Sequence, residues 1–222
     1  MTNVFITFEG IDGSGKDTLI EHCIHLIKSR PEVFGDKYSN IWITREPTKI
    51  TCAGKKLAQK LKHGFASKFE AAQLFVEDRI EHSNIIKQIL PYSHVLCSRY
   101  DLSTLAYQKT QGLDFEELYN MHRYNESKGT LIPNLTIYIK TDPHIAFKRI
   151  HKRNENRNEN REIFETLDFQ IELSKNYDFV IEKLRKRGRE VITINGNTEL
   201  EEVKKELRKA LIKVQHKITK KH

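Results

Sequence analysis

The chain has 222 residues, of which 38% are hydrophobic, and its net charge is +8. Much of the positive charge lies in residues 204–221, on a predicted helix face and tail exposed to solvent. This distribution does not require a nucleic-acid partner. This length allows one sizeable core, so we expect a single domain over residues 1–222. No apolar run approaches the roughly 20 residues that span a bilayer, and no basic and apolar leader precedes the first strand, so we expect a cytoplasmic protein without a membrane partner.

A glycine-rich loop lies between a predicted strand and a predicted helix near the N-terminus. Residues 4–8 are β-branched and aromatic, and apolar residues recur at helical spacing in residues 19–27. The spacing G-x-x-x-x-G-K is typical of a loop whose N–H groups wrap a phosphate chain and whose lysine reaches the outer phosphates. The residues of this predicted nucleotide site are Gly10, Ile11, Asp12, Gly13, Ser14, Gly15, Lys16, Asp17 and Thr18.

One position of this loop departs from the usual pattern. The residue after the lysine is normally Ser or Thr, whose hydroxyl ligates Mg²⁺. Here it is Asp17, and Thr18 comes one residue too late to replace that hydroxyl. The departure requires an explanation if the loop binds a metal–nucleotide complex.

The rest of the chain alternates short apolar strands with helices. Further strands are predicted at residues 41–44, 95–97, 135–139 and 191–194. Helices are predicted at 53–63, 67–90, 115–124 and 163–186, around 105–107, from 142 onward, and from a capping box of Thr198 and Glu201 to about 218. This alternation predicts an α/β fold in which helices flank a five-stranded parallel sheet on both faces.

Four polar clusters follow strands or lie near the loop. They comprise Arg45-Glu46-Pro47, Asp78-Arg79, Ser98-Arg99-Tyr100 and Asp12. Ligands of open α/β sheets bind at the carboxyl ends of the strands, so we expect these residues to face a substrate.

The cysteines and histidines predict neither a disulfide nor a zinc site. Cys23, Cys52 and Cys97 are odd in number and far apart, which is typical of reduced thiols, and we expect two of them in the core. The ten histidines form no H-E-x-x-H pattern.

A tandem repeat places Arg153, Arg157 and Arg161 four residues apart, separated by Asn-Glu-Asn. Arginines at this spacing share one face if the segment is helical, although asparagine lowers helix propensity. Two interpretations remain open: a hinged lid that closes over a nucleotide, or a disordered and solvated loop.

Several motifs together resemble the thymidylate kinase family. The matching stretches are Phe8-Glu9-Gly10-x-Asp12-Gly13-x-Gly15-Lys16, Thr44-Arg45-Glu46-Pro47, Leu74-Phe75-x-x-Asp78-Arg79, Arg99-Tyr100-Asp101-Leu102-Ser103-x-x-Ala106-Tyr107-Gln108 and Pro133-Asn134-Leu135-Thr136-Ile137-Tyr138. The resemblance covers residues 4 to about 180. It implies a three-layer P-loop kinase fold with a small lid, transfer of the γ-phosphoryl group of ATP to dTMP, Mg²⁺ as cofactor and a homodimer.

The resemblance also implies roles for the acceptor-binding segment, about residues 45–80, and for residues beyond it. Arg45 and Arg99 would hold the acceptor phosphate, and Asp12 would contact the sugar 3′-hydroxyl. The other implied roles are stacking on thymine for Phe75, a hydrogen bond to the base edge for Arg79, crowding of the 2′ position for Tyr107, and lining of the base pocket for Ser103 and Gln108. Taken alone, Phe75 and Tyr107 are more typical of a core, and Arg45 and Arg79 of surface ion pairs.

The same resemblance places the lid at about residues 149–162. In one branch of the family an arginine follows the loop aspartate and acts on the transferring phosphate, whereas here that residue is Gly13. In the other branch the lid supplies the arginine, which makes Arg153 and Arg161 the first candidates and Arg149 a candidate for binding ATP. The implied catalytic set is Lys16, Asp12, Arg99, Arg153 and Arg161.

A second departure concerns the metal. The family places an aspartate before the strand-end arginine, near Mg²⁺, and this chain has Ser98 there. Three interpretations follow: Asp17 and Ser98 have exchanged roles and still hold Mg²⁺, catalysis has been lost and a nucleotide-binding protein remains, or Asp17 only stabilises the first turn of its helix. A kinase of another deoxynucleoside monophosphate, or of a deoxynucleoside, is the alternative activity.

Overall fold

The computed structural model describes residues 3–30, 40–127, 130–157 and 166–219. Within these residues, five strands form one parallel sheet in the order β2-β3-β1-β4-β5. The strands are β1 (Phe5–Glu9), β2 (Ile41–Arg45), β3 (His94–Ser98), β4 (Leu135–Lys140) and β5 (Val191–Asn195). The α/β prediction is therefore confirmed, and β1 lies at the centre of the sheet between β3 and β4.

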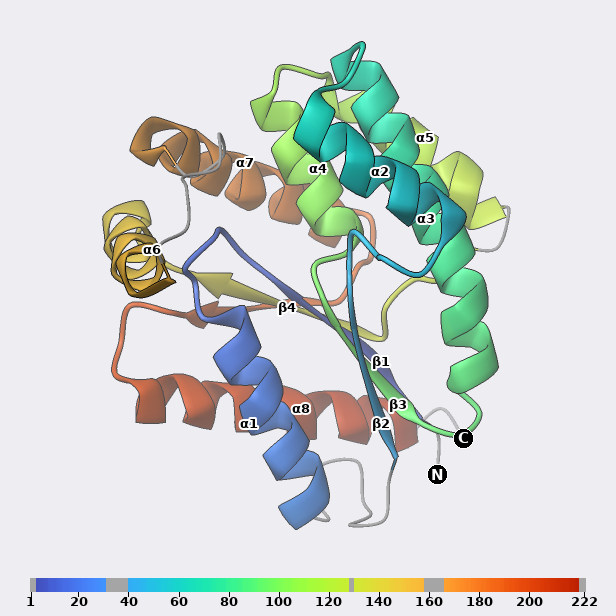
Figure 1. The fold of residues 1–222 in the computed structure, drawn as a ribbon. Helices are drawn as coiled ribbons and strands as arrows, with labels where there is room; N and C mark the ends of the chain where they lie inside the picture. The colour runs from blue at the N-terminus through green and yellow to red at the C-terminus, as the bar shows by residue number, and fades with distance from the viewer. Residues whose placement is uncertain (1–2, 31–39, 128–129, 158–165, 220–222) are drawn as a thin grey trace.

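Helices cover both faces of the sheet, as Figure 1 shows. Those in the described ranges are α1 (Lys16–Ser29), α2 (Cys52–His63), α3 (Lys68–Ile89), α4 (Asp101–Thr110), α5 (Phe115–Ser127), α6 (Pro143–Arg157), α7 (Leu167–Lys186) and α8 (Leu200–Thr219). Helices α1 and α8 lie on one side of the sheet, and α3, α4 and α7 lie on the other (Figure 1). The result is the three-layer arrangement expected for a parallel sheet.

Side chains of the central strand alternate between the two layers. Ile6 and Phe8 pack in the cluster that includes residues of α1 and α8. Phe5 points the other way, where its ring meets the edge of Tyr100 with centroids 5.1 Å apart. All five residues of β1 are buried, because a central parallel strand is covered on both faces.

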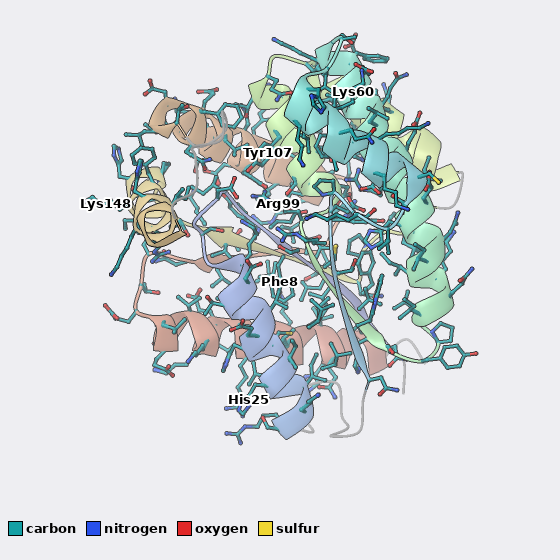
Figure 2. All side chains as sticks on the ribbon, viewed as in Figure 1. Phe8, His25, Lys60, Arg99, Tyr107 and Lys148 are labelled. Carbon is teal, nitrogen blue, oxygen red and sulfur yellow. The ribbon has the colours of Figure 1, made fainter. Side chains whose placement is uncertain are left out.

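Three strand ends meet at one edge of the sheet. Arg45 pairs with Ser98 across β2 and β3, and Phe8 pairs with Ser98 across β1 and β3. The glycine-rich loop and the segments that begin at Arg45 and Arg99 therefore leave the sheet side by side. Figure 2 labels Arg99 beside these strand ends and Tyr107 on α4 above them.

Helix α6 continues through Arg157, so the first half of the segment predicted as a lid is helical. Arg161 and the rest of that segment lie outside the described residues. Helix α7 begins at Leu167, where the Thr166 side chain accepts a hydrogen bond from the N–H of Phe169.

The predicted capping box at the start of α8 is wrong. The helix begins at Leu200, and the Thr198 hydroxyl donates to the carbonyl of Asn195 instead of capping the helix. No helix in the described ranges is both long and apolar enough to cross a membrane.

Candidate active site

The glycine-rich loop joins β1 to α1 through left-handed backbone. Gly13 has φ +76°, and a Cβ there would lie 2.3 Å from the carbonyl oxygen of Ala146 in α6. Gly15 has φ +92° and immediately precedes the first turn of α1. Both positions therefore need glycine, which brings the loop backbone close to α6 and aims the N–H groups at the start of α1 toward a ligand.

Lys16 lies folded along its own loop. Its ammonium donates to the carbonyls of Gly10, at 3.0 Å, and Ile11, at 2.8 Å, and only 8% of the residue is exposed. Burial and the nearby Arg99 charge lower the Lys16 pKa to about 7. The cation therefore has an incomplete set of counter-charges, which an anionic ligand would complete.

A cavity of about 220 Å³ opens over the loop. It is lined by Asp12, Gly13, Gly15, Lys16, Asp17, Thr18, Arg45, Ser98, Arg99, Arg149 and Ile150. The cavity thus brings together the predicted nucleotide loop, the two arginines predicted for the acceptor phosphate, and the two residues predicted for the metal.

Asp12, Arg99 and Tyr107 form a connected group at this cavity. Asp12 Oδ1 pairs with the Arg99 guanidinium, and Asp12 Oδ2 accepts a hydrogen bond of 2.9 Å from the Tyr107 hydroxyl. Burial disfavours the Asp12 carboxylate, but the charges of Arg99 and Lys16 outweigh it and lower the pKa to about 2. Asp12 is therefore ionised at neutral pH and holds Arg99 in place.

Arg99 begins the segment after β3 with a left-handed backbone, φ 64°. Such a conformation is uncommon for a residue with a side chain and often marks a functional position. Its guanidinium lies 5.1 Å from the centroid of the Tyr107 ring, and its Nη1 is 3.4 Å from the carbonyl of Gly10.

Glu9 is a residue of this site that the sequence did not reveal. Its carboxylate accepts hydrogen bonds from the N–H of Tyr100, at 2.8 Å, and from the hydroxyl of Ser103. Burial raises its pKa to about 7, although the Ser103 hydrogen bond opposes that rise. A carboxylate at the end of an otherwise apolar strand was the signal that could have identified it.

The predicted base-binding residues do not line the 220 Å³ cavity. Arg79 is 1% exposed and donates to Glu46 Oε2 at 2.6 Å and to Thr104 Oγ1 at 2.8 Å. Its Nε has no hydrogen-bond partner in the described part of the chain. Phe75 is half-buried on α3, and Gln108 is buried on α4 with its Oε1 also lacking a partner there.

Helix α3 holds the loop between β2 and α2 through a second set of carboxylates. Asp78, which is 1% exposed, accepts from the N–H of Thr48 at 2.7 Å and from the hydroxyls of Thr48, at 2.5 Å, and Thr51. Glu81 accepts from the N–H of Cys52 at 2.7 Å, at the N-terminus of α2. These bonds fix the chain just after Arg45.

The residues predicted for a metal fit a magnesium–nucleotide complex better than a stand-alone metal site. Ser98 is 5% exposed, and its Oγ finds no hydrogen-bond partner among the described residues. Asp17 is exposed on the first turn of α1. Within the described ranges, we find no group of three or more His, Cys, Asp or Glu side chains that could hold a metal. Most ligands of a bound Mg²⁺ would therefore come from phosphates and water, as is usual for this ion.

Arg149 links the loop to the far end of the sheet. Its guanidinium lies 3.5 Å from the carbonyl of Gly13 and 3.3 Å from that of Gly196, which follows β5. Arg153 belongs to the same helix, but its side chain, like all of Arg161, lies outside what the structure describes.

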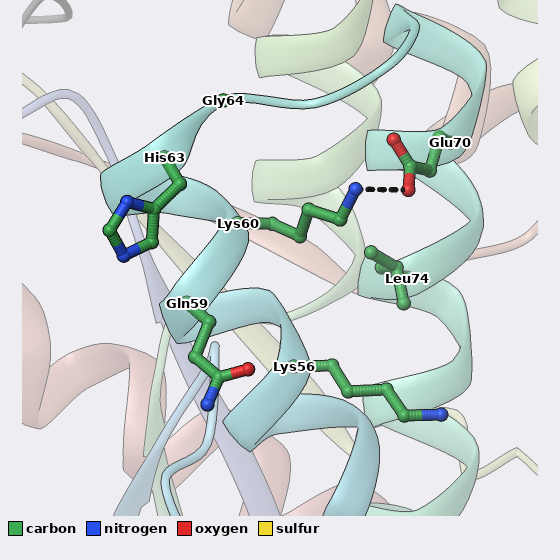
Figure 3. A pocket seen from close by; sticks show the side chains of 7 residues that line it. All are labelled: Lys56, Gln59, Lys60, His63, Gly64, Glu70 and Leu74. Carbon is green, nitrogen blue, oxygen red and sulfur yellow. Dashed lines mark ion pairs between the residues drawn. The ribbon is translucent and has the colours of Figure 1, made fainter.

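A larger cavity, about 490 Å³, lies between α2 and α3 (Figure 3). Its lining residues are Lys56, Gln59, Lys60, His63, Gly64, Glu70 and Leu74, and Lys60 reaches across from α2 to pair with Glu70 at 2.9 Å. It shares no lining residue with the smaller cavity and contains none of the predicted site residues. The smaller cavity is therefore the candidate active site.

Comparisons with known proteins agree with this geometry. The family model described as Thymidylate kinase matches residues 8–207. Two similar chains are the "Probable thymidylate kinase" of Picrophilus torridus, 35% identical over 94% of this chain and 96% of that relative, and that of Methanococcus aeolicus, 32% identical over 95% and 96%. The "Thymidylate kinase" of Bacillus cereus is 28% identical over 93% and 96%. Because the family model covers most of the chain, the protein belongs to the thymidylate kinase family.

Proposed function

We propose that the protein transfers the γ-phosphoryl group of ATP to dTMP, giving dTDP, as a single kinase domain. The observation that carries this function is the 220 Å³ cavity, in which the Lys16 loop faces Arg45 and Arg99 from two neighbouring strand ends. Such a cavity provides cations for two phosphate groups at once. The names of the similar chains support dTMP as the acceptor.

The two arginines favour an acceptor that already carries a phosphate. Two like charges about 4 Å apart repel by about 4 kcal/mol at an effective dielectric constant near 20, so bringing two phosphates together requires counter-cations. Phosphoryl transfer asks the protein mainly for alignment and charge neutralisation. An uncharged deoxynucleoside would need no such pair of arginines.

The charged side chains and the loop at the cavity have proposed roles. The loop N–H groups and Lys16 hold the phosphates of ATP, and Arg45 and Arg99 hold the phosphate of dTMP. Asp12 orients Arg99 and binds the sugar 3′-hydroxyl, while Tyr107 occupies the space that a 2′-hydroxyl would need. Arg149 contributes to the nucleotide site from α6.

The base pocket is proposed to lie behind this cavity. Phe75 stacks on the thymine, Ser103 and Gln108 line the pocket, and Arg79 faces the base edge through the Nε that lacks a partner in the described structure. The Glu46 carboxylate neutralises Arg79 and leaves that donor available.

Mg²⁺ is the proposed cofactor, held by Asp17 and Ser98 together with the nucleotide phosphates. The bound cation would neutralise phosphate charge. Arg153 and Arg161 are proposed to act on the transferring phosphoryl group from the lid. The remaining proposals are a homodimer, by family resemblance, and a cytoplasmic location, which the free cysteines Cys23, Cys52 and Cys97 suit.

The test is an acceptor panel. Purified protein with ATP and Mg²⁺ is offered dTMP, dUMP, dGMP, dCMP, UMP or thymidine, and ADP formation is recorded, with Lys16→Ala as the inactive control. We expect turnover with dTMP in the range of about 1–100 s⁻¹ that is usual for kinases. If the protein prefers another acceptor, that acceptor takes the place of dTMP as the proposed substrate. Binding of ATP and dTMP without turnover would indicate a protein that has lost catalysis.

A further inference from the structure

Asp17 and Ser98, the two residues expected near a metal, each have the functional group that is usual at the other's position. In P-loop proteins a Ser or Thr hydroxyl on the loop and an aspartate at a strand end together hold Mg²⁺. In this chain the loop offers the carboxylate of Asp17, and the strand end offers the hydroxyl of Ser98. Both residues line the same cavity, together with Lys16.

Ser98 is built into the sheet with its hydroxyl unused. As the last residue of β3, it pairs with Phe8 of β1 and Arg45 of β2, so its position is fixed from both sides. The residue is 5% exposed, and its Oγ has no partner among the residues that the structure describes. A buried hydroxyl is normally hydrogen-bonded, and Ser98 lines the cavity, so its Oγ is available to a ligand that binds there.

Asp17 places a negative charge where the nucleotide phosphates must lie. It is exposed on the first turn of α1, and no hydrogen bond or ion pair involves it within the described residues. The usual hydroxyl at this position is neutral and can approach a phosphate directly. A carboxylate cannot do so unless a cation lies between them, because the two negative charges repel.

We propose that Asp17 and Ser98 have exchanged the carboxylate and the hydroxyl of the metal site, and that Asp17 makes nucleotide binding conditional on a divalent cation. ATP with Mg²⁺ would bind because Asp17 and Ser98 would hold the cation, whose charge offsets the repulsion between the Asp17 carboxylate and the phosphates, whereas ATP alone would meet that repulsion. The inference rests on the proposed function only in that the loop binds a nucleoside triphosphate.

The test measures ATP affinity with and without metal by calorimetric titration, once in Mg²⁺ and once in EDTA. For the wild type we expect a dissociation constant at least about 100-fold higher in EDTA than in Mg²⁺. We expect Asp17→Ser to reduce the ratio of the dissociation constant in EDTA to that in Mg²⁺ to below about 10, mainly because ATP binds more tightly in EDTA. Asp17→Asn, which keeps the shape of the side chain, reduces it in the same way and replaces Asp17→Ser if that variant does not fold.

Two further variants test the exchange itself. Ser98→Asp alone adds a second carboxylate and raises the ratio above that of the wild type, whereas the double variant Asp17→Ser/Ser98→Asp returns it near the wild-type value. Electron paramagnetic resonance of Mn²⁺, measured with and without ATP, reports directly whether the metal and the nucleotide bind together. Glu21→Ser removes an exposed carboxylate one turn further along α1 and leaves the ratio unchanged.

Equal ATP affinity in Mg²⁺ and EDTA would overturn the proposal. So would a double variant whose ratio stays as low as that of Asp17→Ser, because an aspartate at position 98 would then not replace the carboxylate of Asp17. This readout is independent of the acceptor. If the metal ratio behaves as expected while no acceptor is phosphorylated, the inference stands and the proposed function fails. If dTMP is phosphorylated while Asp17→Ser leaves the ratio unchanged, the function stands and the inference fails.

Discussion

Arg79 and Glu46 form an ion pair in which Nη2 and Oε2 are 2.6 Å apart and neither side chain is more than 3% exposed. The other Glu46 oxygen lies 3.0 Å from Nδ1 of His82, and the Nε2 of that ring is 2.8 Å from the Thr44 hydroxyl. The turn after β2, which begins at Arg45, is therefore tied to α3 through buried polar contacts. This network therefore also positions Arg45, the last residue of β2, which is proposed to hold the acceptor phosphate.

Removal of the Glu46 carboxylate is expected to destabilise the protein strongly. Glu46→Ala leaves the Arg79 charge buried without its partner, which typically costs about 3–5 kcal/mol of the free energy of unfolding. Urea denaturation measures the loss. Glu182→Ala, which breaks an exposed ion pair with Lys186, serves as the control and should leave stability nearly unchanged. A Glu46→Ala loss no larger than that of the control would contradict the prediction.

Arg45 is expected to affect acceptor binding rather than ATP binding. Arg45→Ala removes one cation facing the acceptor phosphate and should raise the KM for dTMP about 10- to 100-fold, while the KM for ATP stays within about twofold. Steady-state kinetics with each substrate varied in turn separates the two effects. Lys28→Ala, at an exposed position far along α1, is the charge-matched control. Equal changes in both KM values would assign Arg45 to a general structural role.

Tyr107 is expected to select the sugar of the acceptor. Tyr107→Ala opens the space beside Asp12 and should raise the activity with ribothymidine monophosphate, relative to dTMP, by about 10-fold or more. Tyr107→Phe loses the 2.9 Å hydrogen bond to Asp12 but keeps the ring, so it should retain the preference for deoxyribose. If the phenylalanine variant accepts the ribonucleotide as well as the alanine variant does, the hydroxyl rather than the ring is responsible.

Glu9 gives the stability of the protein a specific pH dependence. Burial raises its pKa from 4.5 to about 7, so the folded protein holds this proton more tightly than the unfolded chain does. Its contribution to the free energy of unfolding is therefore fully present below about pH 4.5 and is lost as the pH rises through about 7.

Glu9→Gln stays neutral and lacks this dependence. Between pH 5 and pH 8, wild-type stability should fall relative to that of Glu9→Gln by an amount on the order of 3 kcal/mol. Urea denaturation of both proteins across that range measures the difference. Parallel curves would show that Glu9 does not change its ionisation there.

The lid arginines are expected to affect the chemical step. Arg153→Ala and Arg161→Ala should each lower kcat by about 100-fold or more, with little change in either KM, because an arginine on the transferring phosphoryl group acts mainly in the transition state. Lys152→Ala, at an exposed neighbouring position, controls for the loss of a charge from α6. A change confined to the KM for ATP would assign these arginines to binding alone.

The sequence predicted the layers of the fold and the phosphate loop because both depend on local patterns. Residues 4–8 are apolar enough to mark the central strand, and the spacing from Gly10 to Lys16 places the anion site directly after it. The strand-end position of Arg45 and Arg99 followed from the rule that parallel strands end at one edge. The structure confirms that these two arginines line one cavity.

Other features depend on partners far away in the chain and could not be read locally. The role of Arg79 at the base edge stays a prediction, but its buried contacts with Glu46 and Thr104, which lie 33 and 25 residues away in the sequence, could not be read locally. Glu9 stands out only as a carboxylate that ends an apolar strand, because its partners Tyr100 and Ser103 lie 91 and 94 residues away in the sequence. The capping box predicted at Thr198 does not form, because the Thr198 hydroxyl donates a hydrogen bond to the carbonyl of Asn195. Residue preferences alone do not determine which of these two hydrogen bonds a threonine makes.

The contact between Gly13 and the carbonyl of Ala146 restricts how this enzyme can change. Any side chain at position 13 would have its Cβ 2.3 Å from that oxygen, so an arginine could enter the loop only if α6 moved away. Since α6 carries Arg149 and leads into the segment proposed as a lid, such a movement would also displace the arginines proposed to act from that helix. Because Gly13 of the loop and Arg149 and Ile150 of α6 line the same cavity, a side chain at position 13 would disturb two of its walls at once.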